Sequence, residues 1–121
     1  MKKTLLVLSV ALFTTQLMAM ETPSLKCFGT EPFWGMTTKD STLSLDNFGE
    51  NAEKFTINSV TAAVGTQEGW ATLITAKNEK SSISLIAKKE SCNDGMSDEE
   101  YTYSAYVQTG DALLIGCCND N

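Results

Sequence analysis

The chain has 121 residues, of which 15 are acidic and 9 are basic, so its formal net charge is −6 at pH 7. Every basic residue is a lysine, and histidine is absent. Binding to nucleic acid or to an anionic membrane surface requires clustered positive charge, with arginine for base readout, so we expect neither partner. The absence of histidine excludes Ser-His-Asp and Cys-His catalysis and most zinc sites.

The first residues have the pattern of a secretion signal. Met1–Lys3 is positively charged, Thr4–Leu17 is uncharged and mostly apolar, and Ala19 is the small residue that precedes a cleavage site. We therefore expect residues 1–19 to be removed. A membrane anchor is the alternative, but it needs about 20 apolar residues, and this run is shorter and is soon followed by Glu21.

The expected mature chain, residues 20–121, has 15 acidic and 7 basic residues and a net charge of −8. It is long enough for a single domain with a modest core. We expect a monomer in the periplasm or the medium, with no membrane insertion after cleavage. The charge is compatible with a cationic protein partner, although a solvated acidic surface needs no partner and is the commoner case.

Alternation of apolar and polar residues predicts strands joined by turns. The expected strands, in chain order, are 41–45, 55–58, the more continuously apolar 70–76, 82–87, 101–108 and a last strand that carries Cys117 and Cys118. The side chains expected to point inward include Leu43, Leu45, Ile83, Leu85 and Ala87. Glycine- and asparagine-rich segments separate these strands, as in an antiparallel meander. The sequence thus predicts an all-β domain that closes into a barrel or a sandwich.

One short helical turn is expected in the connection before Tyr101. The segment Ser97-Asp98-Glu99-Glu100 matches a capping box, in which the Ser97 hydroxyl and the Glu100 carboxylate bond each other's backbone amides.

Four cysteines, Cys27, Cys92, Cys117 and Cys118, predict two disulfides in an exported domain of this size. Three connectivities are possible. Neighbouring side chains on a strand point to opposite faces, so Cys117 and Cys118 each reach a distant partner. We expect Cys92–Cys117 and Cys27–Cys118. Without a C-x-x-C pair or a histidine, thiolate metal binding and redox catalysis are disfavoured, and we expect no cofactor and no metal.

Two segments around these cysteines hold the candidate binding residues. In the first, Pro32 precedes Phe33 and Trp34, which we expect to be aromatic anchors entering the first strand, and Glu31 lies beside them. Glu31 has two interpretations: a turn-capping carboxylate, or a catalytic acid that would need a second carboxylate nearby.

In the second segment, Asp94-Gly95 is a turn dipeptide, and we expect Met96 to fill the core behind it. Asp94 and Asp98 are candidate binding residues and the possible second carboxylate for Glu31. With Glu99 and Glu100 they form an acidic group that could bind calcium, although the ligand spacing of an EF-hand loop is missing.

The segments CFGTEPFW (27–34), CNDGMSD (92–98) and the late Gly116-Cys117 resemble an uncharacterised family of bacterial exported proteins and lipoproteins. Its members combine an N-E-P-x-W or T-E-P-F-W opening, a C-x-D-x-M-S segment and a terminal G-C. The resemblance covers about residues 27–118 and implies a periplasmic or membrane-associated location. The architecture is also similar, more loosely, to small β-barrels of periplasmic lysozyme inhibitors and META-type lipoprotein domains.

These observations favour a non-enzymatic binding or inhibitor-like domain that acts on a cationic protein. The alternatives are an envelope structural or stress-related domain without a specific ligand, and a hydrolase that uses carboxylates.

Overall fold

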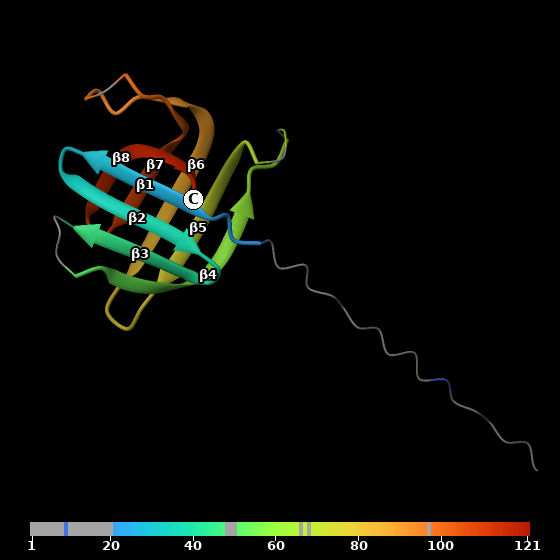
Figure 1. Ribbon diagram of the computed structural model, residues 1–121. Helices are drawn as coiled ribbons and strands as arrows, with labels where there is room; N and C mark the ends of the chain where they lie inside the picture. The colour runs from blue at the N-terminus through green and yellow to red at the C-terminus, as the bar shows by residue number, and fades with distance from the viewer. Residues whose placement is uncertain (1–8, 10–20, 48–50, 66, 68, 97) are drawn as a thin grey trace, which may run out of the picture.

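Among the described residues, eight antiparallel strands form a closed barrel in which neighbours in sequence pair and β8 pairs with β1 (Figure 1). The computed structural model describes residues 9, 21–47, 51–65, 67, 69–96 and 98–121. The strands are β1 (Leu25–Thr30), β2 (Phe33–Lys39), β3 (Thr42–Asn47), β4 (Glu53–Ala62), β5 (Ala71–Lys77), β6 (Ser82–Cys92), β7 (Tyr101–Thr109) and β8 (Ala112–Asp120). The predicted all-β meander is confirmed, and it closes as a barrel in which each of the eight described strands is paired along both edges.

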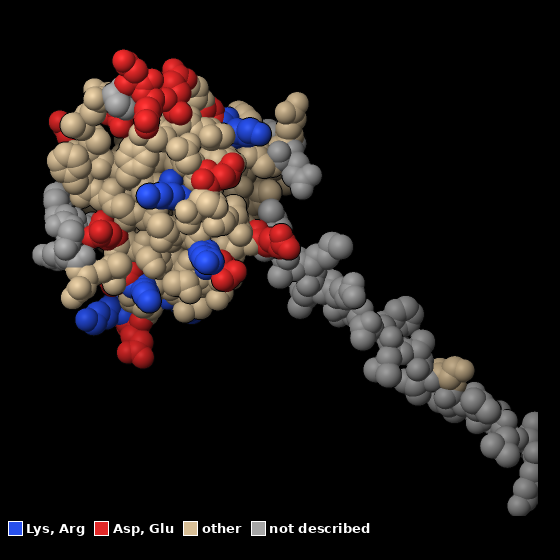
Figure 2. All heavy atoms as spheres, in the orientation of Figure 1, with Lys and Arg blue, Asp and Glu red and all other residues tan. Residues whose placement is uncertain are grey.

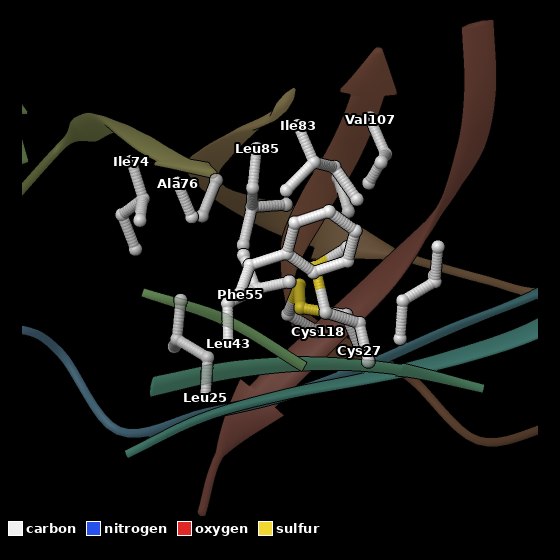
Figure 3. Packing of buried hydrophobic residues seen from close by; sticks show 14 of the residues in the cluster. Leu25, Cys27, Leu43, Phe55, Ile74, Ala76, Ile83, Leu85, Val107 and Cys118 are labelled. Atoms are coloured by element: carbon white, nitrogen blue, oxygen red, sulfur yellow. A yellow bond between two sulfur atoms is a disulfide. The ribbon is translucent and has the colours of Figure 1, made fainter. Parts of the chain in front are cut away.

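The interior of the barrel is filled by the residues that alternation assigned to it. Leu43, Leu45, Ile83, Leu85 and Ala87 are all buried, as predicted. Figure 3 shows how such side chains from opposite walls meet around Phe55. The cluster of buried residues consists of Leu25, Cys27, Trp34, Met36, Leu43, Leu45, Phe55, Ile74, Ala76, Ile83, Leu85, Ala87, Ala105, Val107 and Cys118.

The prediction that Phe33 and Trp34 enter the first strand was wrong. They begin β2, because Leu25–Thr30 already forms β1 and pairs with it from Leu25↔Thr38 to Thr30↔Phe33. In β1, Leu25 and Cys27 are buried while Lys26 is exposed, so this segment does alternate.

The expected strand 70–76 lies one residue later in the structure. Trp70 precedes β5 and is 42% exposed, with the Lys88 ammonium 5.2 Å from its ring centroid. The apolar segment does not form a strand buried on both faces. Ile74 and Ala76 are buried inside the barrel, whereas Leu73 faces outward and is half-buried.

The predicted helical turn at 97–100 is absent from its described residues, since 98–100 are not helical. Ser97, the expected cap, lies outside the described residues. The Glu100 carboxylate accepts a hydrogen bond from the Ser91 hydroxyl instead, at the end of β6. This hydrogen bond therefore attaches the end of the β6–β7 connection to β6.

The segment expected to be a signal peptide, residues 1–19, lies outside the described residues except for Ser9. In the described part of the chain, no helix has the length and apolar character needed to span a membrane.

Candidate functional site

Two disulfides lie on opposite faces of the barrel wall, with the predicted connectivity. Cys27–Cys118 joins paired residues of β1 and β8 inside the barrel, with a Cα–Cα distance of 4.0 Å; Figure 3 shows it among the core side chains. Cys92–Cys117 has a Cα–Cα distance of 5.7 Å and attaches the end of β6 to the outer face of β8. The first bridge closes the barrel, and the second fastens a loop. Two such bridges are typical of extracytoplasmic proteins.

A register shift lets Cys92 reach Cys117. The pairing of β6 with β7 is irregular between Lys89 and Cys92, which bends the end of β6. Beyond this bulge, Tyr101 contacts Phe28 of β1 edge-to-face, with ring centroids 4.6 Å apart. The connection between β6 and β7 therefore starts, at Asn93 and Asp94, beside Ile115–Cys117 of β8 and Phe28–Thr30 of β1.

A cavity of about 230 Å³ lies where this connection meets the turn between β1 and β2. We call it the junction cavity. Its lining consists of Phe28, Gly29, Thr30, Glu31, Cys92, Asn93, Asp94, Ile115, Gly116 and Cys117. The structure thus brings Glu31 and Asp94 from the two cysteine segments to one cavity, with the Cys92–Cys117 bridge in its wall.

Glu31 forms the tip of a two-residue turn with Pro32, between the paired residues Thr30 and Phe33. The Glu31–Pro32 peptide is cis, as in a type VI turn. Glu31 is exposed, and the described residues provide it with no hydrogen bond or ion pair. Its carboxylate is therefore available to a partner.

Trp34 and Phe33, expected to act together, have different environments. Trp34 is 4% exposed and its indole lies inside the barrel, whereas Phe33 is 57% exposed. A Cβ on Gly29 would lie 2.0 Å from the indole nitrogen, and one on Gly116 would lie 2.7 Å from a ring carbon. The indole occupies the space that these two glycines leave, so Trp34 is a packing residue, and Phe33 remains a candidate contact.

The segment around Asp94 is a tight turn, as predicted. The Asn93 and Asp94 side-chain oxygens accept hydrogen bonds from the backbone amides of Gly95 (2.7 Å) and Met96 (2.8 Å). Gly95 has φ of 78°, which favours glycine. The expectation that Met96 fills the core was wrong: it is 69% exposed, because the connection lies outside the barrel.

Acidic side chains gather over the β6–β7 connection. Figure 2 shows them as the densest acidic group on the face in view. Asp98, Glu99 and Glu100 are exposed, and Asp94 is half-buried. We call these four residues and Glu31 the acidic rim. Glu31 and Asp94 line the junction cavity, and the other three follow in the β6–β7 connection. In the described part of the chain, no three carboxylate or thiolate side chains are placed to share a metal ion.

Tyr103 gives a test of the electrostatics on β7. Its hydroxyl donates to the Asp120 carboxylate at 3.1 Å. Burial, and then the hydrogen bond and charge of Asp120, raise the pKa of Tyr103 above its ordinary value. The neutral tyrosine therefore stabilises the folded state below the unfolded pKa of about 10, and this stabilisation is lost as the pH rises through the folded pKa.

We expect the Asp120→Asn variant to lower the pKa of Tyr103, because both contributions of the carboxylate are removed. The measurement is tyrosinate absorbance against pH in the wild type and the variant. Tyr103→Phe serves in both backgrounds to subtract the other tyrosines. The same midpoint with and without Asp120 would contradict the assignment.

Two cavity residues, Phe28 and Ile115, were missed as candidates. Phe28 follows Cys27 within the opening segment and contacts Tyr101, and Ile115 shares the outer face of β8 with Cys117. The face argument that separated Cys117 from Cys118 would have identified Ile115.

No protein-family model, curated protein or solved structure matches the chain. The resemblance to exported proteins with a T-E-P-F-W opening therefore stays a prediction.

Proposed function

We propose that this protein is an exported, non-enzymatic binding domain, inhibitor-like in action, that holds a cationic protein in the periplasm or the medium. One observation carries the proposal: the β1–β2 turn and the β6–β7 connection, far apart in the sequence, meet at the junction cavity, and together they carry the acidic rim.

The junction is fixed before any partner arrives. The Cys92–Cys117 bridge attaches one loop to β8, and the Asn93 and Asp94 side chains bond the backbone of the same loop. A loop that is already ordered loses less conformational entropy on binding. The acidic rim would orient a basic partner and accelerate its association. A cationic lysozyme-like hydrolase is the kind of protein that such a surface fits.

A carboxylate-based hydrolase has less support. The Asp94 carboxylate already accepts the Met96 amide, and Glu31 is exposed to solvent. A general acid is usually held in a cleft with a shifted pKa, next to the carboxylate that assists it. We therefore assign no catalytic residue.

A structural envelope domain without a specific ligand is the second candidate. It is favoured by the packing of Trp34 against Gly29 and Gly116, since these residues of the opening segment and of the late Gly116-Cys117 pair serve the barrel interior.

A binding experiment with a C-type lysozyme and other basic proteins, at two salt concentrations, distinguishes the two candidate functions. We expect salt-sensitive binding and inhibition, which Glu31→Gln combined with Asp98→Asn weakens about threefold to tenfold at low salt. Glu79→Gln is the matched control, because Glu79 is an exposed carboxylate in the β5–β6 turn. If no basic protein binds at either salt concentration, the binding function is wrong.

A further inference from the structure

A row of apolar side chains crosses the outside of the barrel over β5, β6, β7 and β8. Leu73, Ile86, Tyr106 and Ile115 are successive cross-strand partners in the register. Ile86 is 43% exposed, Tyr106 37% and Ile115 63%, while Leu73 is half-buried. Direct partners on antiparallel strands lie within about 5.5 Å, so these four side chains form one continuous strip. We call them the apolar row.

The composition of this strip differs from that of the outer wall around it. An antiparallel sheet with one face on the core normally places polar residues on the other face. On β6 and β7 the neighbouring outward pairs follow this rule, with Ser84 and Gln108 on one side and Lys88 and Ser104 on the other. On β8, Leu113 is 65% exposed and extends the apolar surface beyond Ile115. An exposed apolar strip with polar flanks is typical of a protein contact surface.

The apolar row leads into the junction cavity, because Ile115 belongs to both. On the flank nearest the cavity, the Lys88 ammonium lies 3.1 Å from the Glu90 carboxylate, which also accepts a hydrogen bond from Ser104 at 2.6 Å. These opposite charges offset each other. The charge that a partner meets beside the row therefore comes mainly from the acidic rim.

We propose that the apolar row and the acidic rim form one docking surface, occupied by a basic protein whose contact surface combines apolar side chains with lysine or arginine. This inference rests on the proposed function and adds the apolar part of the partner. Charge complementarity at the rim selects and orients the partner, and burial of the row removes apolar surface from water.

The test compares two short peptides of equal charge, one alternating lysine with leucine and one alternating lysine with serine. We expect the leucine peptide to bind the full mature chain more tightly. Ile86→Thr combined with Ile115→Thr should weaken its binding about tenfold and leave the serine peptide unaffected. Threonine keeps the β-branched shape that strands favour, so the barrel should stay folded. Val64→Thr is the control, since Val64 is 93% exposed in the β4–β5 connection and does not belong to the row.

The outcomes distinguish a failure of the apolar row from a failure of the proposed function. Equal binding of both peptides, or a leucine advantage that persists in the double variant, would overturn the apolar row while the acidic rim stands. If neither peptide binds, both proposals fail. Light scattering of the protein alone tests whether a second copy of the chain occupies the row instead. A dimer that the double variant abolishes would show this and would overturn the proposal of a basic partner.

Discussion

Gly116→Ala is expected to destabilise the barrel by about 3 kcal/mol or more, at the upper end of the usual range for overpacking. The added Cβ would lie 2.0 Å from the carbonyl oxygen of Phe28 and 2.7 Å from the Trp34 ring. The Phe28 backbone has little room to retreat, since β1 is paired with β2 on one side and β8 on the other. The measurement is the urea midpoint of unfolding, followed by circular dichroism.

Gly35→Ala is the matched control on the same barrel. Gly35 also lies in a strand, but its Cβ would meet only the Asp46 Cβ, at 4.0 Å. We expect this variant to change the stability by less than about 1 kcal/mol, and in the stabilising direction, because alanine restricts the unfolded chain. A Gly116→Ala protein that unfolds at the same urea concentration as Gly35→Ala would contradict the packing argument.

Gly29→Ala separates a side-chain clash from a backbone clash. Its Cβ would lie 2.0 Å from the Trp34 indole nitrogen, and its nearest atoms all belong to that side chain. Adding Trp34→Leu should therefore restore part of the stability lost in Gly29→Ala. The same addition should help Gly116→Ala much less, since the Phe28 carbonyl stays in place.

Much of the fold could be predicted because a barrel strand repeats one simple pattern. Period-two alternation placed Leu43, Leu45, Ile83 and Leu85 inside, and the same rule assigned Cys117 and Cys118 to different partners. β1 is not among the predicted strands, because its residues Cys27–Thr30 belong to the opening segment and its alternating run is short. Local alternation of apolar and polar residues therefore predicts both the fold class and which side chains face the core.

The site could be predicted only in part, because it depends on how strands are staggered. The sequence indicated that Glu31 and Asp94 come together, since the cysteines connect their segments. It could not show that a bulge after Lys89 carries the connection outside the barrel, and this placement leaves Met96 exposed. The apolar row likewise exists only through the register, because Ile86 and Ile115 lie far apart in the sequence.

Removing the inner disulfide should lower the free energy of unfolding more than removing the outer one. The chain-entropy model gives about 4.6 kcal/mol for Cys27–Cys118, with its separation of 91 residues, and about 3.5 kcal/mol for Cys92–Cys117, with 25. Domains of this size are stable by only about 5–15 kcal/mol, so Cys27→Ala/Cys118→Ala should lose much of the fold. Urea midpoints of the two double variants give the comparison, and equal midpoints would contradict the order.

The two disulfides also differ in burial, and this difference bears on the proposed binding function. Cys27 and Cys118 are 1% and 0% exposed inside the barrel, whereas Cys92 is half-buried in the wall of the junction cavity. Limiting dithiothreitol should therefore reduce Cys92–Cys117 first, which alkylation and mass spectrometry would detect while circular dichroism still shows a folded barrel.

The Cys92→Ala/Cys117→Ala variant should keep the barrel but bind basic proteins more weakly, because its loop must be ordered on binding. Wild-type affinity in this variant would mean that the bridge serves stability alone and that the acidic rim needs no fixed loop.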